Sequence, residues 1–210
     1  MPNKAYNEIA GRSVERLAAL SDGLFAIAMT LLIIDLHAPV SEAIHSETEL
    51  WQALGRLAPQ LLMYLMGFLT LGIFWVGQQT QLNVFAETDR DLTWIHIGFL
   101  AAVALMPFST AIAAAFITYR VALFVYWLNL LLLGLALYAS WAYAARAGLL
   151  KDQVAEEMSR ATRRRIVVFQ LLYAVGFLLS FVSTYLAIAF IFLLQLDSAI
   201  APRLGRLWRI

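Results

Sequence analysis

Long apolar stretches without charge divide this chain into predicted helices. Four stretches contain no Asp, Glu, Lys or Arg, and each is longer than the ~20 residues that a helix needs to cross a bilayer. They are residues 57–86, 92–119, 121–145 and 166–196. A further apolar stretch, near residues 17–36, contains Asp22 near its start and Asp35 at its end. The pattern predicts an all-α membrane protein.

The last stretch is too long for one span. As a single helix its 31 residues would measure ~46 Å, against a hydrocarbon core of ~30 Å. The polar residues Ser180, Ser183 and Thr184 lie near its middle and favour a turn. We therefore expect one transmembrane domain over residues 1–210 with six helices, at about 17–36, 57–79, 92–113, 121–145, 166–181 and 183–197.

The composition agrees with this class of protein. Hydrophobic residues make up 62% of the chain and charged residues 14%, whereas a soluble domain has about 25% charged residues. The absence of cysteine excludes disulfides, thiolate metal sites and cysteine nucleophiles. The net charge of +1 neither favours nor excludes nucleic acid. We expect the lipid bilayer as surroundings and no nucleic-acid partner.

The basic residues indicate an orientation. With six spans, 13 of the 15 Lys and Arg residues fall on the side that carries both termini, and only Arg56 and Arg120 fall on the other. Because basic residues concentrate on the cytoplasmic side of a membrane protein, we expect both termini in the cytosol and the protein in the cell membrane. A model with five helices would weaken this bias.

The first predicted helix carries an apolar stripe interrupted by one hydroxyl. On a helical wheel its members lie within about 60° of Ile27; they are Leu20, Gly23, Leu24, Ile27, Thr30, Leu31 and Ile34. Such a stripe can pack against another helix. It can also line a pore, where apolar side chains gate by dewetting and hydroxyls replace part of an ion's hydration shell. The pattern alone leaves both interpretations open.

Asp22 points about 140° away from this stripe. Because an ionisable side chain at membrane depth is costly, it usually has a partner. Donors at the same depth end the second helix and begin the third: Trp75, Gln78, Gln79, Thr93, Trp94 and His96. We interpret Ser21 and Asp22 as the hub of a hydrogen-bond network that positions the first helix. The alternative is a proton-carrying carboxylate of a transporter. Arg16 is off the Asp22 face and is expected to pair with another helix, a loop or headgroups.

A family resemblance lies in the run Arg16…Leu20-Ser21-Asp22-Gly23-Leu24-Phe25-Ala26-Ile27-Ala28-Met29-Thr30-Leu31. It resembles the signature R-x-x-x-F-S-D-G-x-F-A-I-A-I-T-L of the prokaryotic transmembrane protein 175 family, relatives of the lysosomal potassium channel. Trp75 and Pro107-Phe108-Ser109-Thr110, similar to the family's P-F-x-T element, extend the resemblance to helix 3. This chain departs from the family at Leu20, where Phe is usual, and at Gly77-Gln78-Gln79, where Asn-His-His is frequent.

The resemblance implies a six-helix subunit that assembles as a homotetramer, with the first helix of each subunit lining a central potassium pore. It implies a constriction at Ile27, further apolar rings at Leu31 and Ile34, and a selectivity layer of Thr30 hydroxyls. Ser21 and Asp22 match the family's Ser-Asp pair, and Arg16 matches its motif arginine. Potassium is then the permeant ion, and no cofactor or resident metal is expected.

Three classes of function are considered for such a membrane protein: a channel, a coupled transporter and an enzyme. The stripe carries no carboxylate and none lies at the bilayer midplane, where a coupled transporter places its ion site. No set of catalytic or metal-ligating residues shares one membrane depth, so we do not expect an enzyme. The chain lacks a Thr-Val-Gly-Tyr-Gly filter and the spaced arginines of a voltage sensor. We therefore expect a passive, leak-type potassium-selective channel. The alternative is a proton-coupled secondary transporter or a proton-leak pathway that uses Asp22.

Overall fold

The fold is all-α, as predicted. The computed structural model describes residues 13–41, 44–152 and 156–200, and its elements in these ranges are helices. In chain order they are α2 (Val14–Leu31), α3 (Glu47–Val84), α4 (Arg90–Ala104), α5 (Met106–Ala115), α6 (Arg120–Ala147), α7 (Glu156–Leu179) and α8 (Thr184–Ile200). A single isolated bridge between Phe85 and Leu150 joins two connections in the described part of the chain.

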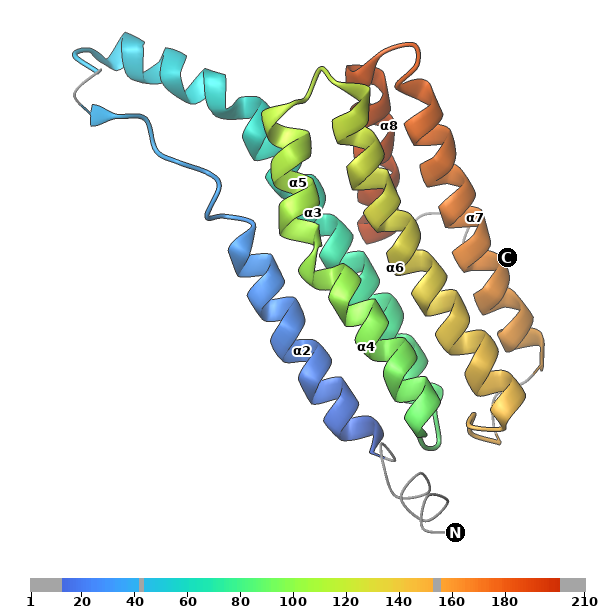
Figure 1. Ribbon diagram of the computed structural model, residues 1–210. Helices are drawn as coiled ribbons and strands as arrows, with labels where there is room; N and C mark the ends of the chain where they lie inside the picture. Colours follow the sequence, from blue (N-terminus) through green and yellow to red (C-terminus); the bar gives the residue numbers. More distant parts are fainter. Residues whose placement is uncertain (1–12, 42–43, 153–155, 201–210) are drawn as a thin grey trace.

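The helices run alternately up and down the bundle (Figure 1), with α5 continuing the direction of α4. The start of α2, the α3–α4 connection and the α6–α7 connection therefore lie at one end of the molecule. We call this the basic end, because Arg16, Arg90 and Arg146 lie there. Helix α6 packs against α3, α4, α5 and α7, whereas α2 lies at the edge and packs against α3, α4 and α5.

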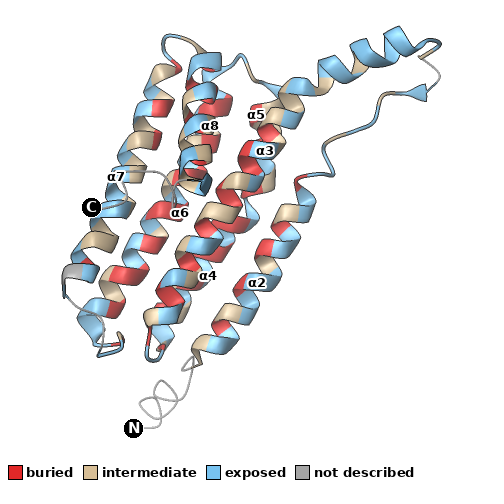
Figure 2. Cartoon of the chain, turned by 180° about the vertical axis from the view of Figure 1, so that it is seen from behind, coloured by how far each residue is buried: buried red, intermediate tan, exposed pale blue. Residues whose placement is uncertain are grey.

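Several described helices meet the requirements of a membrane span. Three segments are long and apolar enough to cross a bilayer, and Thr184–Ile200 is a shorter apolar helix. The three are Glu47–Val84, Arg90–Ala115 and Arg120–Ala147. Since 38 residues of α3 extend for about 57 Å at 1.5 Å per residue, this helix exceeds the hydrocarbon core. Its first turns project from the bundle and are largely exposed (Figure 2).

The start of α3 corrects the expected boundary at residue 57. Residues 47–56, which precede the expected second helix, are helical from Glu47 onward. The Ser46 hydroxyl accepts the Glu49 backbone N–H at 3.2 Å, and Glu49 Oε2 accepts the His45 N–H at 2.7 Å. These contacts satisfy free donors at a helix start in the manner of a capping box. The Ser-x-x-Glu spacing is visible in the sequence and could have located this start.

Other boundaries also differ from expectation. The first helix was expected to reach residue 36, but α2 ends at Leu31 and turns occupy residues 32–35. The expected helix 92–113 is interrupted at Leu105, and Pro107 lies in the first turn of α5, where its missing N–H costs little. The stretch 166–196 is divided around residues 180–183, and α7 starts ten residues earlier than expected.

The core lies between α3, α4, α5 and α6, and one face each of α2, α7 and α8 packs against it (Figure 2). Its largest buried side chains include Met63 and Met66 of α3, Phe99 of α4 and Tyr126 of α6. A second apolar cluster at the basic end contains Leu17, Leu82, Phe85, Leu92 and Trp141. Only one face of helix α2 packs into these clusters, and its opposite face remains exposed.

Candidate functional site

One face of α2 packs on the bundle. No helix that the structure describes covers the opposite face. The buried residues of α2 are Leu17, Ser21, Phe25 and Ala28, spaced as one helical face. The predicted stripe lies mainly on the uncovered side. Four of its large apolar members are exposed: Leu20 by 53%, Ile27 by 57%, Leu31 by 42% and Ile34 by 62%. Leu24, at the border of the stripe, is half-buried and packs against the core.

The members of the stripe differ in how firmly the helix orients them. Ile27 and Leu31 lie within α2. Ile34 lies beyond its end, where the N–H groups of Ile33 and Ile34 bond to carbonyls three residues back, at 3.4 and 3.1 Å. The regular α-helical wheel therefore orients Ile27 and Leu31 but does not determine the direction of Ile34.

Thr30 is exposed on the same side of α2. Its hydroxyl donates to the backbone carbonyl of Ile27 at 2.8 Å. Because a hydroxyl has one hydrogen and two acceptor lone pairs, this bond uses the hydrogen within the helix. The oxygen of Thr30 can then present its acceptor side outward.

Two consecutive residues of α2 are held by three side chains of α3. Trp75 donates its indole N–H to Asp22 Oδ1 at 2.7 Å, and Gln79 donates its amide to the same oxygen at 2.7 Å. The amide of Gln78 donates to the Ser21 hydroxyl at 2.7 Å. Ser21 in turn donates to the Leu17 carbonyl at 2.9 Å. The structure thus brings together Ser21, Asp22, Trp75, Gln78 and Gln79 at one level of the bundle.

His96, expected in this group, lies elsewhere, and Arg16 lies apart from it, as its position off the Asp22 face predicts. His96 is buried on α4, with Nδ1 3.4 Å from the Ser140 hydroxyl of α6 and its ring beside Phe85. Arg16 is exposed and makes no side-chain hydrogen bond or ion pair with the described residues. The sequence placed His96 at the depth of Asp22, but depth does not specify the direction in which a side chain points. The expected inclusion of His96 in the Asp22 network is therefore a correction.

A close approach that the sequence analysis missed fixes the far end of α2. A Cβ atom on Gly67 of α3 would lie 2.8 Å from Thr110 Oγ1 and 3.0 Å from Leu32 Cδ2. Glycine at this position therefore lets α5 and the end of α2 pack closely on α3. A small residue within an apolar helix is the sequence signal for such an approach.

A buried polar cluster, also missed, joins three other helices. Thr70 of α3 lies 2.8 Å from the Tyr126 hydroxyl of α6, and Gln195 of α8 donates to Thr70 at 2.7 Å. All three side chains are buried. In the sequence, such a cluster is indicated by polar residues inside apolar stretches, because buried polar groups require partners.

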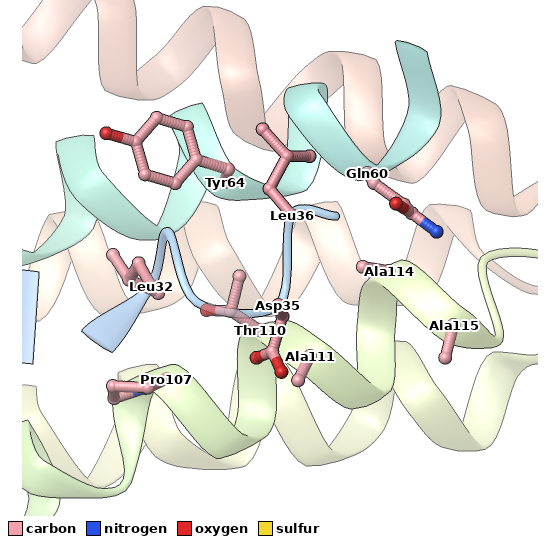
Figure 3. Close-up of a pocket in the computed structure, with 10 residues that line it drawn as sticks. All are labelled: Leu32, Asp35, Leu36, Gln60, Tyr64, Pro107, Thr110, Ala111, Ala114 and Ala115. Atoms are coloured by element: carbon pink, nitrogen blue, oxygen red, sulfur yellow. The ribbon is translucent and has the colours of Figure 1, made fainter. Parts of the chain in front are cut away.

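A cavity of about 220 Å³ lies beside the end of α2, bordered by α3 and α5 (Figure 3). Asp35, Gln60, Tyr64 and Thr110 are its polar lining residues. Figure 3 shows the Asp35 carboxylate, the Gln60 amide and the Tyr64 hydroxyl pointing in different directions.

No group of three or more His, Asp or Glu residues that could hold a metal occurs in the part of the chain that the structure describes.

The comparisons with known proteins concern the same segment. Residues 16–107, which include most of α2 and its contacts on α3, match the family model described as endosomal/lysosomal potassium channel TMEM175. A protein of Streptomyces collinus named as a potassium channel is 37% identical over 179 residues, which cover 83% of this chain and 85% of that protein. This chain belongs to the TMEM175 family.

A solved structure agrees with the TMEM175 assignment. The crystal structure of a lysosomal potassium-selective channel TMEM175 homolog from Chamaesiphon minutus has a TM-score of 0.78 and 29% sequence identity, over 90% of this chain and 98% of that chain. Mouse endosomal/lysosomal proton channel TMEM175 is 31% identical over 109 residues, 50% of this chain and 22% of that protein. The resemblance predicted from the first-helix motif is confirmed. The chain is a multi-pass membrane protein of a channel family and is not an enzyme.

Proposed function

We propose that this chain is the subunit of a passive, leak-type potassium-selective channel, a homotetramer in which α2 of each subunit lines a central pore. The observation that carries the proposal is the apolar face of α2 left uncovered at the subunit edge, where Ile27 is 57% exposed. Asp22, also exposed, lies on the same helix. Because a carboxylate facing lipid is costly, a neighbouring subunit is a better surrounding for the Asp22 side of this helix than acyl chains.

In this proposal Ile27 forms the narrowest ring, and Leu31 and Ile34 form further apolar rings. Such rings close a pore by excluding water. Thr30 forms the hydroxyl layer between them. Since the Thr30 hydrogen is donated to the Ile27 carbonyl at 2.8 Å, its oxygen would face a partly dehydrated potassium ion as an acceptor. Potassium is the permeant ion, and no cofactor takes part.

Asp22 and Ser21 act in the proposal as anchors of α2 rather than as groups in the ion path. Their partners Trp75, Gln78 and Gln79 all belong to α3, so the anchor holds the pore helix to its own subunit. Arg16 takes no part in it and is proposed to contact headgroups at the basic end.

We further propose that the single domain of residues 1–210 has six spans, formed by α2, α3, α4 with α5, α6, α7 and α8. The alternating directions of these helices (Figure 1) support this count. The basic end would face the cytosol, in accord with the positive-inside rule, and the membrane would be the cell membrane. The terminal basic residues used for this prediction lie outside the described residues: Lys4, Arg12, Arg203, Arg206 and Arg209.

A proton pathway through Asp22 is the second candidate. It is favoured by the exposure of Asp22 and by the name of the mouse relative, a proton channel. Against it, Asp22 lies about 140° from the centre of the stripe, and Trp75 and Gln79 both occupy its Oδ1 atom.

Flux across liposomes that contain the purified protein separates the two candidates. For the potassium channel, we expect a current that reverses at the potassium equilibrium potential without a proton gradient, together with four subunits per particle in detergent. Flux that strictly requires a proton gradient, and that Asp22→Asn abolishes in folded protein, would contradict the channel. One or two subunits per particle would contradict the central pore.

A further inference from the structure

A groove of about 590 Å³ runs between α3 and α7, with α6 as its floor. Its walls are mainly apolar, and they include Phe68 and Val76 of α3 and Ile166 and Phe169 of α7. Gly72 also lines it, and a Cβ atom there would meet nothing within 4 Å. The groove is therefore wide enough and apolar enough for a hydrocarbon chain.

One end of the groove is basic. Thr162 and Arg165 are its lining residues nearest to the start of α7, which lies at the basic end. Arg163 and Arg164 directly precede Arg165 in the sequence. Arginine near a membrane surface attracts anionic lipid headgroups, so the charge at this end complements a phosphate group.

Hydroxyl groups line the groove beyond its basic end. The hydroxyls of Tyr173 on α7 and Ser198 on α8 have no hydrogen-bond partner in the described structure, and Tyr173 is only 2% exposed. A buried hydroxyl without a partner is unfavourable. Both oxygens lie within the wall of the groove, and a small side-chain rotation would bring each hydroxyl to an ester oxygen of a lipid.

We propose that this groove binds an anionic glycerophospholipid from the leaflet at the basic end. The phosphate lies at Arg165, the ester oxygens accept from Tyr173 and Ser198, and one acyl chain extends between α3 and α7. The arginines favour an anionic headgroup over a zwitterionic one, and the apolar walls favour a lipid over a free anion.

The lipid would also contact the anchor of α2. Trp75 lines the groove and donates its N–H to Asp22 at 2.7 Å. A bound acyl chain would therefore touch the residue that holds α2 in place. Lipid binding itself does not depend on the proposed pore, but an effect of the lipid on conduction rests on that proposed function.

Brominated lipids, which quench nearby tryptophan fluorescence, test the binding without any measurement of ion flux. The full chain is placed in phosphatidylcholine vesicles with increasing fractions of brominated phosphatidylglycerol or of brominated phosphatidylcholine. We expect brominated phosphatidylglycerol to quench part of the emission at a much lower fraction. Gly72→Leu, which extends into open space in the groove, should remove that part. Gly98→Leu is the matched control, because Gly98 of α4 is exposed, has equal space and does not line the groove.

A second pair of variants tests the headgroup. Arg165→Gln should raise the lipid fraction needed for half-maximal quenching about fivefold, the contribution of one basic residue near the surface. Arg146→Gln, at the same end of the molecule but on α6 and outside the lining, should change it much less. Equal quenching by the two brominated lipids in the wild-type protein would overturn the proposal. So would a change in subunit number in Gly72→Leu, because a second copy of the chain would then occupy the groove. Potassium flux in the same vesicles reports separately on the proposed function.

Discussion

Trp75 of α3 donates its indole N–H to the carboxylate of Asp22 on α2 across 2.7 Å, joining residues 53 positions apart in the chain. Gln79, one turn further along α3, donates to the same oxygen. Helix α2 has one uncovered face, so these bonds and its single buried face determine how it sits on the subunit. The arrangement leaves Ile27 exposed while Asp22 is held to one side.

Trp75→Phe should lower the stability of the subunit by about 1 to 2 kcal/mol, because it removes a hydrogen bond to a carboxylate and leaves most of the ring packing. The free energy of unfolding in detergent measures this loss. Trp94→Phe is the matched control, since Trp94 is 61% exposed and lies outside the Asp22 network. A double-mutant cycle with Asp22→Ala should show coupling between Trp75 and Asp22. Equal losses in the two Phe variants, with no coupling, would contradict the anchoring role.

Ile27→Ala should raise the potassium conductance of the reconstituted protein, because a smaller side chain widens and wets the proposed constriction. Single-channel current at fixed potassium concentration is the measurement. Leu61→Ala provides the control, since Leu61 is 45% exposed but belongs to α3 and not to the proposed pore helix. Unchanged conductance in Ile27→Ala would place the narrow point elsewhere.

Thr30→Val should reduce the preference for potassium over sodium, because it keeps the shape of the side chain and removes the oxygen. Thr30→Ser keeps the hydroxyl and should retain more of the preference. Reversal potentials under mixed potassium and sodium gradients give both ratios. If Thr30→Val kept the wild-type ratio, the hydroxyl layer would have no part in selectivity.

Gly67→Ala should destabilise the protein by about 1 to 3 kcal/mol, the usual cost of overpacking. The new methyl group would lie 2.8 Å from Thr110 Oγ1 and 3.0 Å from Leu32 Cδ2. Gly72→Ala on the same helix meets open space and should be neutral or stabilising by up to about 1 kcal/mol. Denaturant unfolding of the two variants checks the difference. Similar stability in both would mean that α3 does not need glycine at its contact with α5.

The sequence predicted the membrane depth of the polar site more accurately than the residues that form it. Trp75, Gln78 and Gln79 reach Ser21 and Asp22 because antiparallel helices bring equal depths together. His96 shares that depth but bonds to Ser140 instead. Its direction is set by how α4 packs on α6, which hydropathy does not encode.

Local hydrogen bonds determine where the helices begin and end more than hydropathy does. An apolar window placed the start of α3 near residue 57, whereas the contacts of Ser46 and Glu49 place it at Glu47. In the same way, α2 ends at Leu31 although the apolar run continues to Ile34. The Gly67–Thr110 approach depends on three segments at once, so no single stretch of sequence specifies it.

The claim that α2 lines the ion path is tested most directly by thiol modification, because the chain has no native cysteine. Single substitutions Gly23→Cys, Thr30→Cys and Gly98→Cys are compared in reconstituted potassium channels exposed to silver ions. Gly98 is an exposed position on α4, and like Gly23 it has open space around an added Cβ atom. The account predicts that silver blocks the current of Gly23→Cys and Thr30→Cys, which lie on the stripe, and spares Gly98→Cys. Current that survives silver at both stripe positions, or block at Gly98 alone, would contradict it.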